Sequence, residues 1–188
     1  FHLNERVDEV KKENERWIVK TNGGNVFSTP NVIIAGGVGS FEPRKFSVKE
    51  CEKFENKSVL YSIKDKNIFD GKIVSIFGGG DSALDWAVEL SKKSKVNLIH
   101  RRDDFRGAQA TVDKVRKLAK EGKINLFTKF QMTAIKGKDK LESIDIKSDD
   151  NEVKTLQTDY ALGFFGLIMQ LGPIANWGLN IDKKTVEV

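Results

Sequence analysis

Three consecutive glycines, at positions 78 to 80, separate an apolar run from a segment with the composition of a helix. The run Ile73–Phe77 predicts a buried strand, and a helix is expected to open at Asp81 or Ser82. A strand, a glycine turn and a helix in this order form the phosphate-binding turn of a dinucleotide fold. The residues predicted to surround a pyrophosphate there are Gly78, Gly79, Gly80, Asp81, Ser82 and Ala83.

The small residues of this turn have separate purposes. Gly78 permits the tight turn, Gly80 lets the backbone approach a pyrophosphate, and Ala83 takes the third small position, where helix and strand pack closely. The free N–H groups of the helix start attract phosphate. A carboxylate suits a helix N-terminus but would repel a pyrophosphate, so the Asp81 side chain is expected to turn aside.

Cationic side chains directly follow the next predicted strand, Val96–Ile99, roughly 20 residues beyond the glycines. A fold that binds NAD usually carries Asp or Glu near this point, to accept hydrogen bonds from the ribose 2′-hydroxyl. Here the chain has His100, Arg101 and Arg102, with Arg106 a few residues on. Guanidinium groups bind a 2′-phosphate through charge-assisted hydrogen bonds, so the pattern predicts NADP(H) rather than NAD(H). The alternative is that these arginines only solvate a strand end.

Composition narrows the classes of function. The 188 residues are 39% hydrophobic and 31% charged, with a net charge of +5. The lysines are scattered without a basic stripe, so nucleic acid is not indicated, and no apolar run approaches the ~20 residues of a membrane span. The single cysteine suits a reducing cytoplasm, and two distant histidines suggest no metal site. Because the chain starts with Phe rather than Met, a fragment is expected.

The hydrophobic period changes along the chain. Residues 72–127 alternate strand, helix, strand, helix and strand, with helices expected over 82–93 and 108–120, which implies a parallel sheet. Residues 133–156 alternate in twos, which indicates an antiparallel meander laid on that sheet, and 159–165 predicts another apolar strand. The predicted fold class is α/β, with a Rossmann-like three-layer domain.

The flanking regions carry weaker patterns. Strands are expected over 6–10, 15–20 and 26–28, and the sequence ends on a strand-like 185–188. The apolar run Val32–Ala35 predicts a strand buried on both faces, followed by glycines that form either a tight turn or a ligand contact. Cys51 is expected in a surface turn, with an unreactive thiol because nearby carboxylates disfavour the thiolate.

Four segments together resemble the two-domain flavoprotein reductases of the thioredoxin-reductase type, and more closely their bacterial ferredoxin–NADP reductase branch. The segments are Ile33–Arg44 (IIAGGVGSFEPR), Gly78–Ala87 (GGGDSALDWA), His100–Arg106 (HRRDDFR), and Leu171–Ile174 with Asn176–Leu179 (LGPI and NWGL). They occur in the expected order and span nearly the whole length.

The resemblance implies an NADP-binding domain, residues 43–165, inserted into a discontinuous FAD-binding domain that is represented by residues 1–42 and 166–188. FAD contacts would then come from Val7, Gly36, Gly37 and Phe41. The FAD glycine fingerprint and the C-terminal Gly-Asp segment of such enzymes are absent, so the fragment alone is expected to hold FAD poorly and to be inactive. Similar enzymes are homodimers. Segments 40–44 and 163–167 would be two crossing strands about which the NADP-binding domain rotates relative to the FAD-binding domain. Two-domain crystals with and without NADP+ test this hypothesis, and one fixed orientation in both would contradict it.

Cysteine usage separates the branches of this family. A thioredoxin reductase carries a Cys-x-x-Cys pair shortly before the glycine turn, whereas Val59–Asp65 contains no cysteine and Cys51 is solitary. The resemblance therefore implies a reductase that moves electrons between NADPH, FAD and ferredoxin or flavodoxin. No side chain is expected to act as acid, base or nucleophile. The alternative is a protein that lacks the dithiol and serves as a non-catalytic NADP(H)-sensing or interaction module. A third interpretation, a nucleic-acid-binding protein, has only the positive net charge in its favour.

Overall fold

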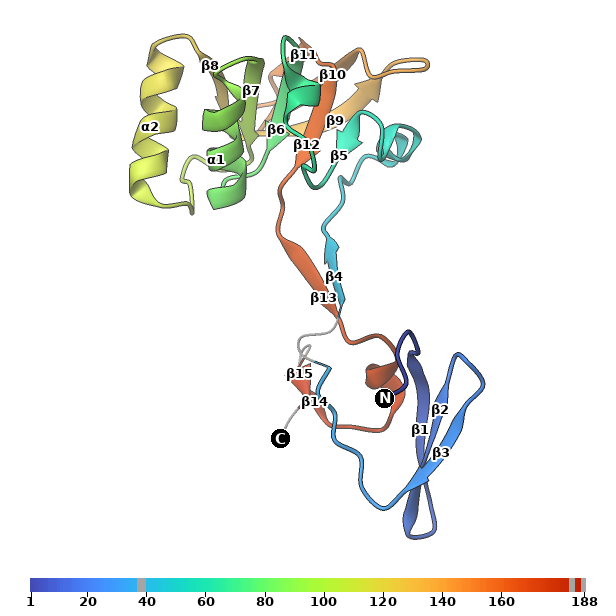
Figure 1. Cartoon of the computed structure of the whole chain (residues 1–188). Coiled ribbons are helices and arrows are strands. Elements are labelled where there is room, and N and C mark those ends of the chain that lie inside the picture. Colours follow the sequence, from blue (N-terminus) through green and yellow to red (C-terminus); the bar gives the residue numbers. More distant parts are fainter. Residues whose placement is uncertain (37–39, 183–184, 187–188) are drawn as a thin grey trace. The chain divides into compact units, whose positions relative to one another are not determined.

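A computed structural model describes residues 1–36, 40–182 and 185–186. By its internal contacts the chain divides into two compact units (Figure 1). The larger unit is Pro43–Gly166, and the smaller unit combines Phe1–Glu42 with Leu167–Val188.

The larger unit is built on a five-stranded parallel sheet with the order β5-β12-β6-β7-β8. Helices α1 (Asp81–Leu90) and α2 (Gln109–Lys120) connect β6 to β7 and β7 to β8. A separate antiparallel sheet, β9 to β11, follows them in the chain (Figure 1). The strand bounds are Val59–Leu60 (β5), Ile73–Phe77 (β6), Lys95–His100 (β7), Ile124–Thr128 (β8), Phe130–Lys136 (β9), Ser143–Ser148 (β10), Val153–Gln157 (β11) and Tyr160–Gly163 (β12).

Two hydrophobic cores hold three layers together. Strand β6 is buried on both faces: Val74 and Ile76 pack with α1 and α2, and Phe77 packs with the antiparallel sheet. Strand β10 is buried on one face only, through Ile144 and Ile146. This difference explains why β6 is apolar on both faces except at the hydrogen-bonded Ser75, while β10 alternates. The predicted α/β class, with a parallel sheet and an antiparallel meander, is confirmed.

Polar side chains cross the middle of the parallel sheet. The Ser75 hydroxyl lies 2.7 Å from the Thr158 hydroxyl and accepts a hydrogen bond from Asn97 Nδ2 at 3.1 Å. Asn125 Nδ2 then donates to Asn97 Oδ1 at 2.9 Å. Ser75, Asn97 and Asn125 are register partners on adjacent strands, so these bonds link β6, β7 and β8 at one level of the sheet.

Two local predictions in the larger unit are wrong. Helix α1 ends at Leu90 rather than near residue 93, because the N–H groups of Lys93 and Ser94 fold back onto the Leu90 carbonyl and Ser94 Oγ donates to Phe69 O. Cys51 is not in a surface turn. It is 1% exposed in the short helix η1 (Lys49–Phe54), because its side chain packs under the antiparallel sheet. A further 3₁₀ helix, η2, spans Asn67–Phe69.

The smaller unit contains an antiparallel meander of β1 (Val7–Glu13), β2 (Arg16–Thr21) and β3 (Val26–Thr29). Helix η3 (Gly172–Asn176) follows β13, and Trp177 Nε1 donates to the Asp8 carbonyl at 3.3 Å. The remaining strands form pairs: β4 (Ser40–Pro43) with β13 (Leu167–Gln170), and β14 (Ile181–Asp182) with β15 (Thr185–Val186). Residues 187–188 of the predicted last strand lie outside the described residues.

The predicted buried strand over 32–35 is not found. This segment has no regular structure, and the Ile33 and Ile34 side chains are 91% and 41% exposed. A strand buried on both faces needs neighbouring strands for its backbone hydrogen bonds, and within the described residues none pairs with this segment.

Candidate functional site

The glycine turn leads directly from β6 into α1. Gly78 adopts a φ of 150°, and its N–H donates to the Ile99 carbonyl at 3.1 Å, which ties the turn to the neighbouring strand. A β-carbon at Gly78 would lie 2.6 Å from Phe164 O and 2.9 Å from the Ala83 β-carbon. Gly78 and the fully buried Ala83 are therefore both small because β6 and α1 pack closely here.

The N-terminus of α1 is available for an anion. Gly80 is the N-cap residue, and no side chain in the described structure caps the helix. A β-carbon on Gly80 would meet no atom within 4 Å, so its surface is open, and Asp81 and Ser82 are exposed in the first turn. The first N–H groups of a helix have no partner inside it and carry partial positive charge, which suits phosphate oxygens.

The Asp81 carboxylate has its own partner. Its Oδ1 atom accepts a hydrogen bond of 2.7 Å from the Ala108 N–H, just before α2 begins. The expectation that this side chain turns aside therefore agrees with the geometry. The interaction also connects the start of α1 to the loop that carries the arginines.

That loop, residues 101–107, follows β7 and folds back over the glycine turn. The Arg106 N–H donates to the Gly79 carbonyl at 2.7 Å. Within the described residues no carboxylate forms an ion pair with Arg101, Arg102 or Arg106, while Asp103 is paired with Lys129 at 3.2 Å. The pairing with Lys129 and a hydrogen bond from Thr128 lower the pKa of Asp103. Three guanidinium groups thus remain available beside the turn.

His100 ends β7 and is half-buried between the turn and the loop. Its Nε2 atom lies 3.1 Å from the Asp104 carbonyl, and its ring stacks on Phe105 with a centroid distance of 5.2 Å. Burial lowers the pKa of His100, and the charges of the three nearby arginines lower it further, whereas the hydrogen bond to Asp104 opposes the shift. These surroundings therefore favour the neutral imidazole more than water does.

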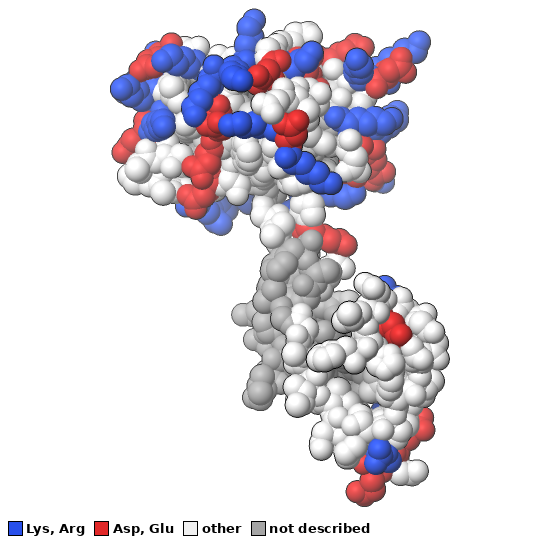
Figure 2. All heavy atoms as spheres, in the orientation of Figure 1, with Lys and Arg blue, Asp and Glu red and all other residues white. Residues whose placement is uncertain are grey.

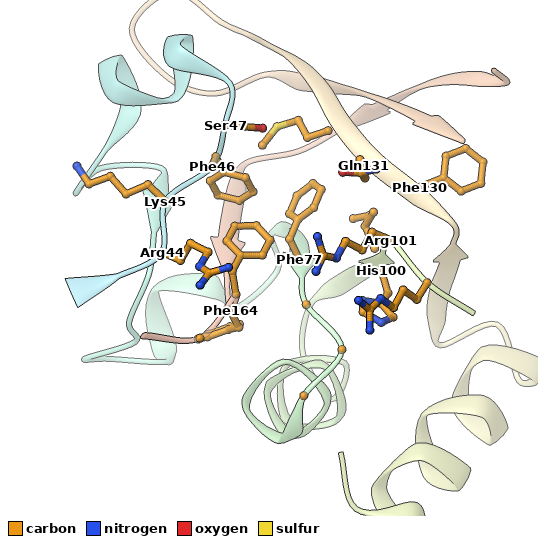
Figure 3. Close-up of a pocket in the computed structure, with 18 of the residues that line it drawn as sticks. Arg44, Lys45, Phe46, Ser47, Phe77, His100, Arg101, Phe130, Gln131 and Phe164 are labelled. Carbon is orange, nitrogen blue, oxygen red and sulfur yellow. The ribbon is translucent and has the colours of Figure 1, made fainter. Parts of the chain in front are cut away.

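The glycine turn, His100 and the three arginines line one cavity of about 430 Å³ (Figure 3). Most of the other lining residues come from distant parts of the larger unit, and several of them are aromatic. Phe46 makes edge-to-face contacts with Phe77 at 5.0 Å and Phe165 at 4.9 Å. These other lining residues are Arg44, Lys45, Phe46, Ser47, Val48, Phe77, Ile99, Phe130, Gln131, Met132, Phe164, Phe165 and Gly166.

Sequence patterns did not predict most of these other lining residues. Phe46 and residues 130–132 carry no motif, and only packing brings them together with the turn. Arg44 ends the segment Ile33–Arg44 that carries part of the resemblance, but a place beside the glycine turn was not predicted for it. Phe164 and Phe165 also line the cavity, and Phe165 is 37% exposed. Gly163 and Gly166 flank this pair.

The residues expected to contact FAD belong to the smaller unit. Val7 begins β1, and a β-carbon on Gly36 would lie 3.1 Å from Ile174 Cδ1. Gly37 lies outside the described residues, as does the side chain of Phe41. Within the described part of the chain, no group of three His, Cys, Asp or Glu side chains could hold a metal ion. Searching the same residues finds no helix that is long and apolar enough to cross a membrane.

Comparison with known proteins identifies the family of this chain. A family profile described as pyridine nucleotide-disulphide oxidoreductase matches residues 1–187. The chain is 66% identical over its full length to the ferredoxin–NADP reductase of Pelagibacter ubique, covering 56% of that protein. It is 46% identical to ferredoxin–NADP reductase 1 of Christiangramia forsetii, covering 54%. The chain thus spans about half the length of the curated relatives it matches.

Solved structures show the same fold. The thioredoxin reductase of Lactococcus lactis, in its FR conformation, matches 96% of this chain and 58% of its own length, with a TM-score of 0.76 and 25% identity. The thioredoxin reductase of T. acidophilum matches 96% of this chain and 58% of its own, with a TM-score of 0.77 and 24% identity.

Proposed function

We propose that this chain, which belongs to the pyridine nucleotide-disulphide oxidoreductase family, is the NADP(H)-binding portion of a flavoprotein reductase. In the whole protein, electrons would move between NADPH, FAD and a ferredoxin or flavodoxin. Relatives at 66% and 46% identity that carry the name ferredoxin–NADP reductase support this proposal.

The observation that carries the proposal is the position of three guanidinium groups that form no ion pair with the residues that the structure describes. Arg101, Arg102 and Arg106 line the same cavity as the glycine turn, and the Arg106 backbone is bonded to Gly79. A 2′-phosphate is the chemical difference between NADP(H) and NAD(H), and guanidinium groups bind phosphate with paired charge-assisted hydrogen bonds. An Asp or Glu at this strand end would instead favour NAD(H).

The cavity offers partners for the other parts of the dinucleotide. The open surface at Gly80 and the uncapped start of α1 suit the pyrophosphate. The rings of Phe46, Phe77 and Phe164 supply apolar area against which a flat ring can pack. These groups bind and orient the nucleotide, and no side chain of the chain is needed as acid, base or nucleophile.

We assign the two units to two cofactors. Pro43–Gly166 would be the NADP-binding domain, and the smaller unit would be part of the FAD-binding domain. When bound, FAD supplies the conversion of a hydride into single electrons. The residues that would lie against it are Val7, Gly36, Gly37 and Phe41. The exposed Ile33 and Ile34, three and two residues before Gly36, support this assignment because they leave apolar surface for further contacts.

The cysteine content favours a direct electron acceptor. Reduction of a disulfide substrate through the protein needs a pair of thiols, and this chain contains only Cys51. That thiol is buried, and burial together with the charges of Glu50 and Glu55 raises its pKa to about 12. A one-electron protein partner fits this chemistry.

We further propose that the whole protein is a cytoplasmic homodimer.

The charge on the surface argues against the alternative of a nucleic-acid binder. Lys and Arg are interspersed with Asp and Glu over the visible face of the larger unit, without a continuous basic stripe (Figure 2). Nucleic-acid-binding domains concentrate their basic residues along one groove or face.

Calorimetric titration with NADP+ and with NAD+ tests the proposal. The wild-type chain is expected to prefer NADP+, and Arg101→Ala/Arg102→Ala is expected to weaken NADP+ binding by about 2 to 4 kcal/mol, or roughly 30- to 1,000-fold. NAD+ binding should change little. The matched control is Arg116→Ala, an exposed arginine on α2 that does not line the cavity. Equal affinity for both nucleotides would remove the 2′-phosphate assignment.

A second measurement separates a reductase from a non-catalytic NADP(H)-sensing or interaction module. The whole gene product is purified with its flavin, and NADPH-dependent reduction of ferredoxin is followed spectroscopically. Turnover is the expected result. Tight NADP(H) binding without flavin reduction would favour the sensing module.

A further inference from the structure

The imidazole of His100 occupies the place of a side chain at Gly79. A β-carbon built on Gly79 would lie 2.3, 2.4 and 2.6 Å from Cε1, Nε2 and Nδ1 of His100. Non-bonded carbon atoms prefer separations of about 3.5–4.0 Å. Gly79 does not adopt the left-handed backbone conformation that Gly78 and other glycines show, so its backbone does not require glycine. The requirement comes from the ring.

The ring cannot move aside freely, because the loop holds it on two sides. Nε2 lies 3.1 Å from the Asp104 carbonyl, and a carbonyl oxygen can only accept, so this nitrogen carries the proton. The ring also stacks on Phe105 with an interplanar angle of 23°. Moving the imidazole away from residue 79 would break the hydrogen bond and the stack together.

The loop is thus attached to the glycine turn at two points. One is the backbone bond from Arg106 N–H to Gly79 O, at 2.7 Å. The other is the imidazole, which touches Gly79 on one side and residues 104 and 105 on the other. The arginines at 101, 102 and 106 lie on this same short loop. Their distance from the phosphate-binding turn therefore depends on both attachments.

We propose that His100 is a positioning residue: packed where a side chain at position 79 would lie, it seats the loop 101–107 on the glycine turn and thereby places the arginines that select NADP(H). The imidazole acts through this packing rather than through a contact of its own with the 2′-phosphate. The middle glycine of the turn is required because the imidazole fills its side-chain space. This inference rests on the proposed NADP(H) site.

A double-mutant cycle between positions 79 and 100 tests the contact. The four proteins are wild type, Gly79→Ala, His100→Ala and the double variant, each titrated with NADP+ and NAD+ and melted thermally. Overpacking by Gly79→Ala is expected to raise the NADP+ Kd roughly 5- to 100-fold. His100→Ala, which releases the loop, is expected to raise the NADP+ Kd about 5- to 10-fold and the NAD+ Kd less than about twofold.

The double variant decides the outcome. If the ring causes the clash, Gly79→Ala adds less than about twofold to the NADP+ Kd in the His100→Ala background. Multiplicative effects of the two changes would overturn the inference. If Gly79→Ala alone fails to fold, the double variant should recover a cooperative melt, and its failure to do so would also overturn it. Gly80→Ala serves as the folding control, because its β-carbon meets open space.

A conservative variant separates positioning from direct contact. His100→Phe keeps an aromatic ring but removes both nitrogens, so the NADP+ Kd is expected to stay within about threefold of wild type. If the imidazole bound the 2′-phosphate directly, His100→Phe would match His100→Ala, and the inference would be wrong. A wild-type chain that bound neither nucleotide would instead contradict the proposed function itself.

Discussion

The carbonyl oxygen of Phe164 lies 2.6 Å from the position that a β-carbon on Gly78 would occupy. Gly78 also has a φ of 150°, where L side chains are strained. Gly78→Ala is therefore expected to lower the free energy of unfolding by about 2 to 4 kcal/mol, because strain and overpacking act together. Urea unfolding measures this. A loss below the ~0.5 kcal/mol of an ordinary surface change would contradict the close packing of β6, α1 and Phe164.

Gly80→Ala should separate binding from stability. The added methyl group meets no protein atom within 4 Å, so the melting temperature is expected to stay near that of wild type. The same methyl group lies on the surface that a pyrophosphate would approach, and both NADP+ and NAD+ should bind at least about tenfold more weakly. Titration of both nucleotides checks this. Unchanged binding would place the pyrophosphate elsewhere.

Two substitutions at Asp81 should separate the effect of its charge on nucleotide binding from the effect of its hydrogen bond on stability. Asp81→Asn keeps an oxygen for the Ala108 N–H but removes a negative charge near the predicted pyrophosphate, so NADP+ is expected to bind about two- to fivefold more tightly at low salt. Asp81→Ala loses the bond as well and should lower the free energy of unfolding by about 1 kcal/mol. Titrations at two salt concentrations test the electrostatic part, since the gain for Asn should shrink at high salt.

The hydrogen-bonded side chains of Thr158, Ser75 and Asn97 within the parallel sheet should contribute to stability. Ser75→Ala leaves the buried Thr158 hydroxyl and Asn97 Nδ2 without their shared partner, and a cost of about 2 to 3 kcal/mol is expected. Thr155→Ala is the control: its hydroxyl bonds to Asp145 on the exposed face of the antiparallel sheet, and its loss should cost less than about 1 kcal/mol. Similar unfolding midpoints for the two variants would refute a structural role for the buried chain.

Alkaline pH should destabilise the larger unit. Burial raises the pKa of Cys51 from 9.0 to about 12 and that of Tyr61 from 10.0 to about 12. Each group binds its proton more tightly in the folded state, so its contribution is complete below the unfolded pKa and is lost as pH rises toward the folded value. Melting temperature is therefore expected to fall between about pH 9 and 12, less steeply in Cys51→Ala/Tyr61→Phe than in wild type. If the melting temperatures of wild type and the double variant fell equally steeply with pH, the raised pKa values of Cys51 and Tyr61 would be contradicted.

The local elements of the larger unit could be predicted from the sequence. A mainly apolar run, a glycine turn and a helix with one apolar face depend on residues that are close along the chain. Except for the end of α1, the elements β6, α1, β7, α2 and β8 lie where those patterns place them. The arginines follow β7 directly, so their place at the carboxyl end of the sheet follows from strand order. The α/β class and the family resemblance rest on the same local features.

Two predictions were wrong because they concerned burial, which depends on the segments that pack against a residue and not on its neighbours along the chain. Val32–Ala35 is apolar enough for a buried strand, but within the described residues no strand pairs with it. Cys51 lies among charged residues, yet its side chain is enclosed by the antiparallel sheet. In both cases the local composition was compatible with more than one environment.

The sequence by itself determined the glycine turn, the cationic loop and the order of the parallel unit, because these follow from neighbouring residues and from strand order. Only the tertiary structure decided that Phe46, Phe130 and Phe164 complete the cavity, that Asp81 holds Ala108, and that His100 fills the side-chain space of Gly79. These contacts join residues about 20 to more than 80 positions apart, and their close packing is a property of the folded core rather than of any local pattern.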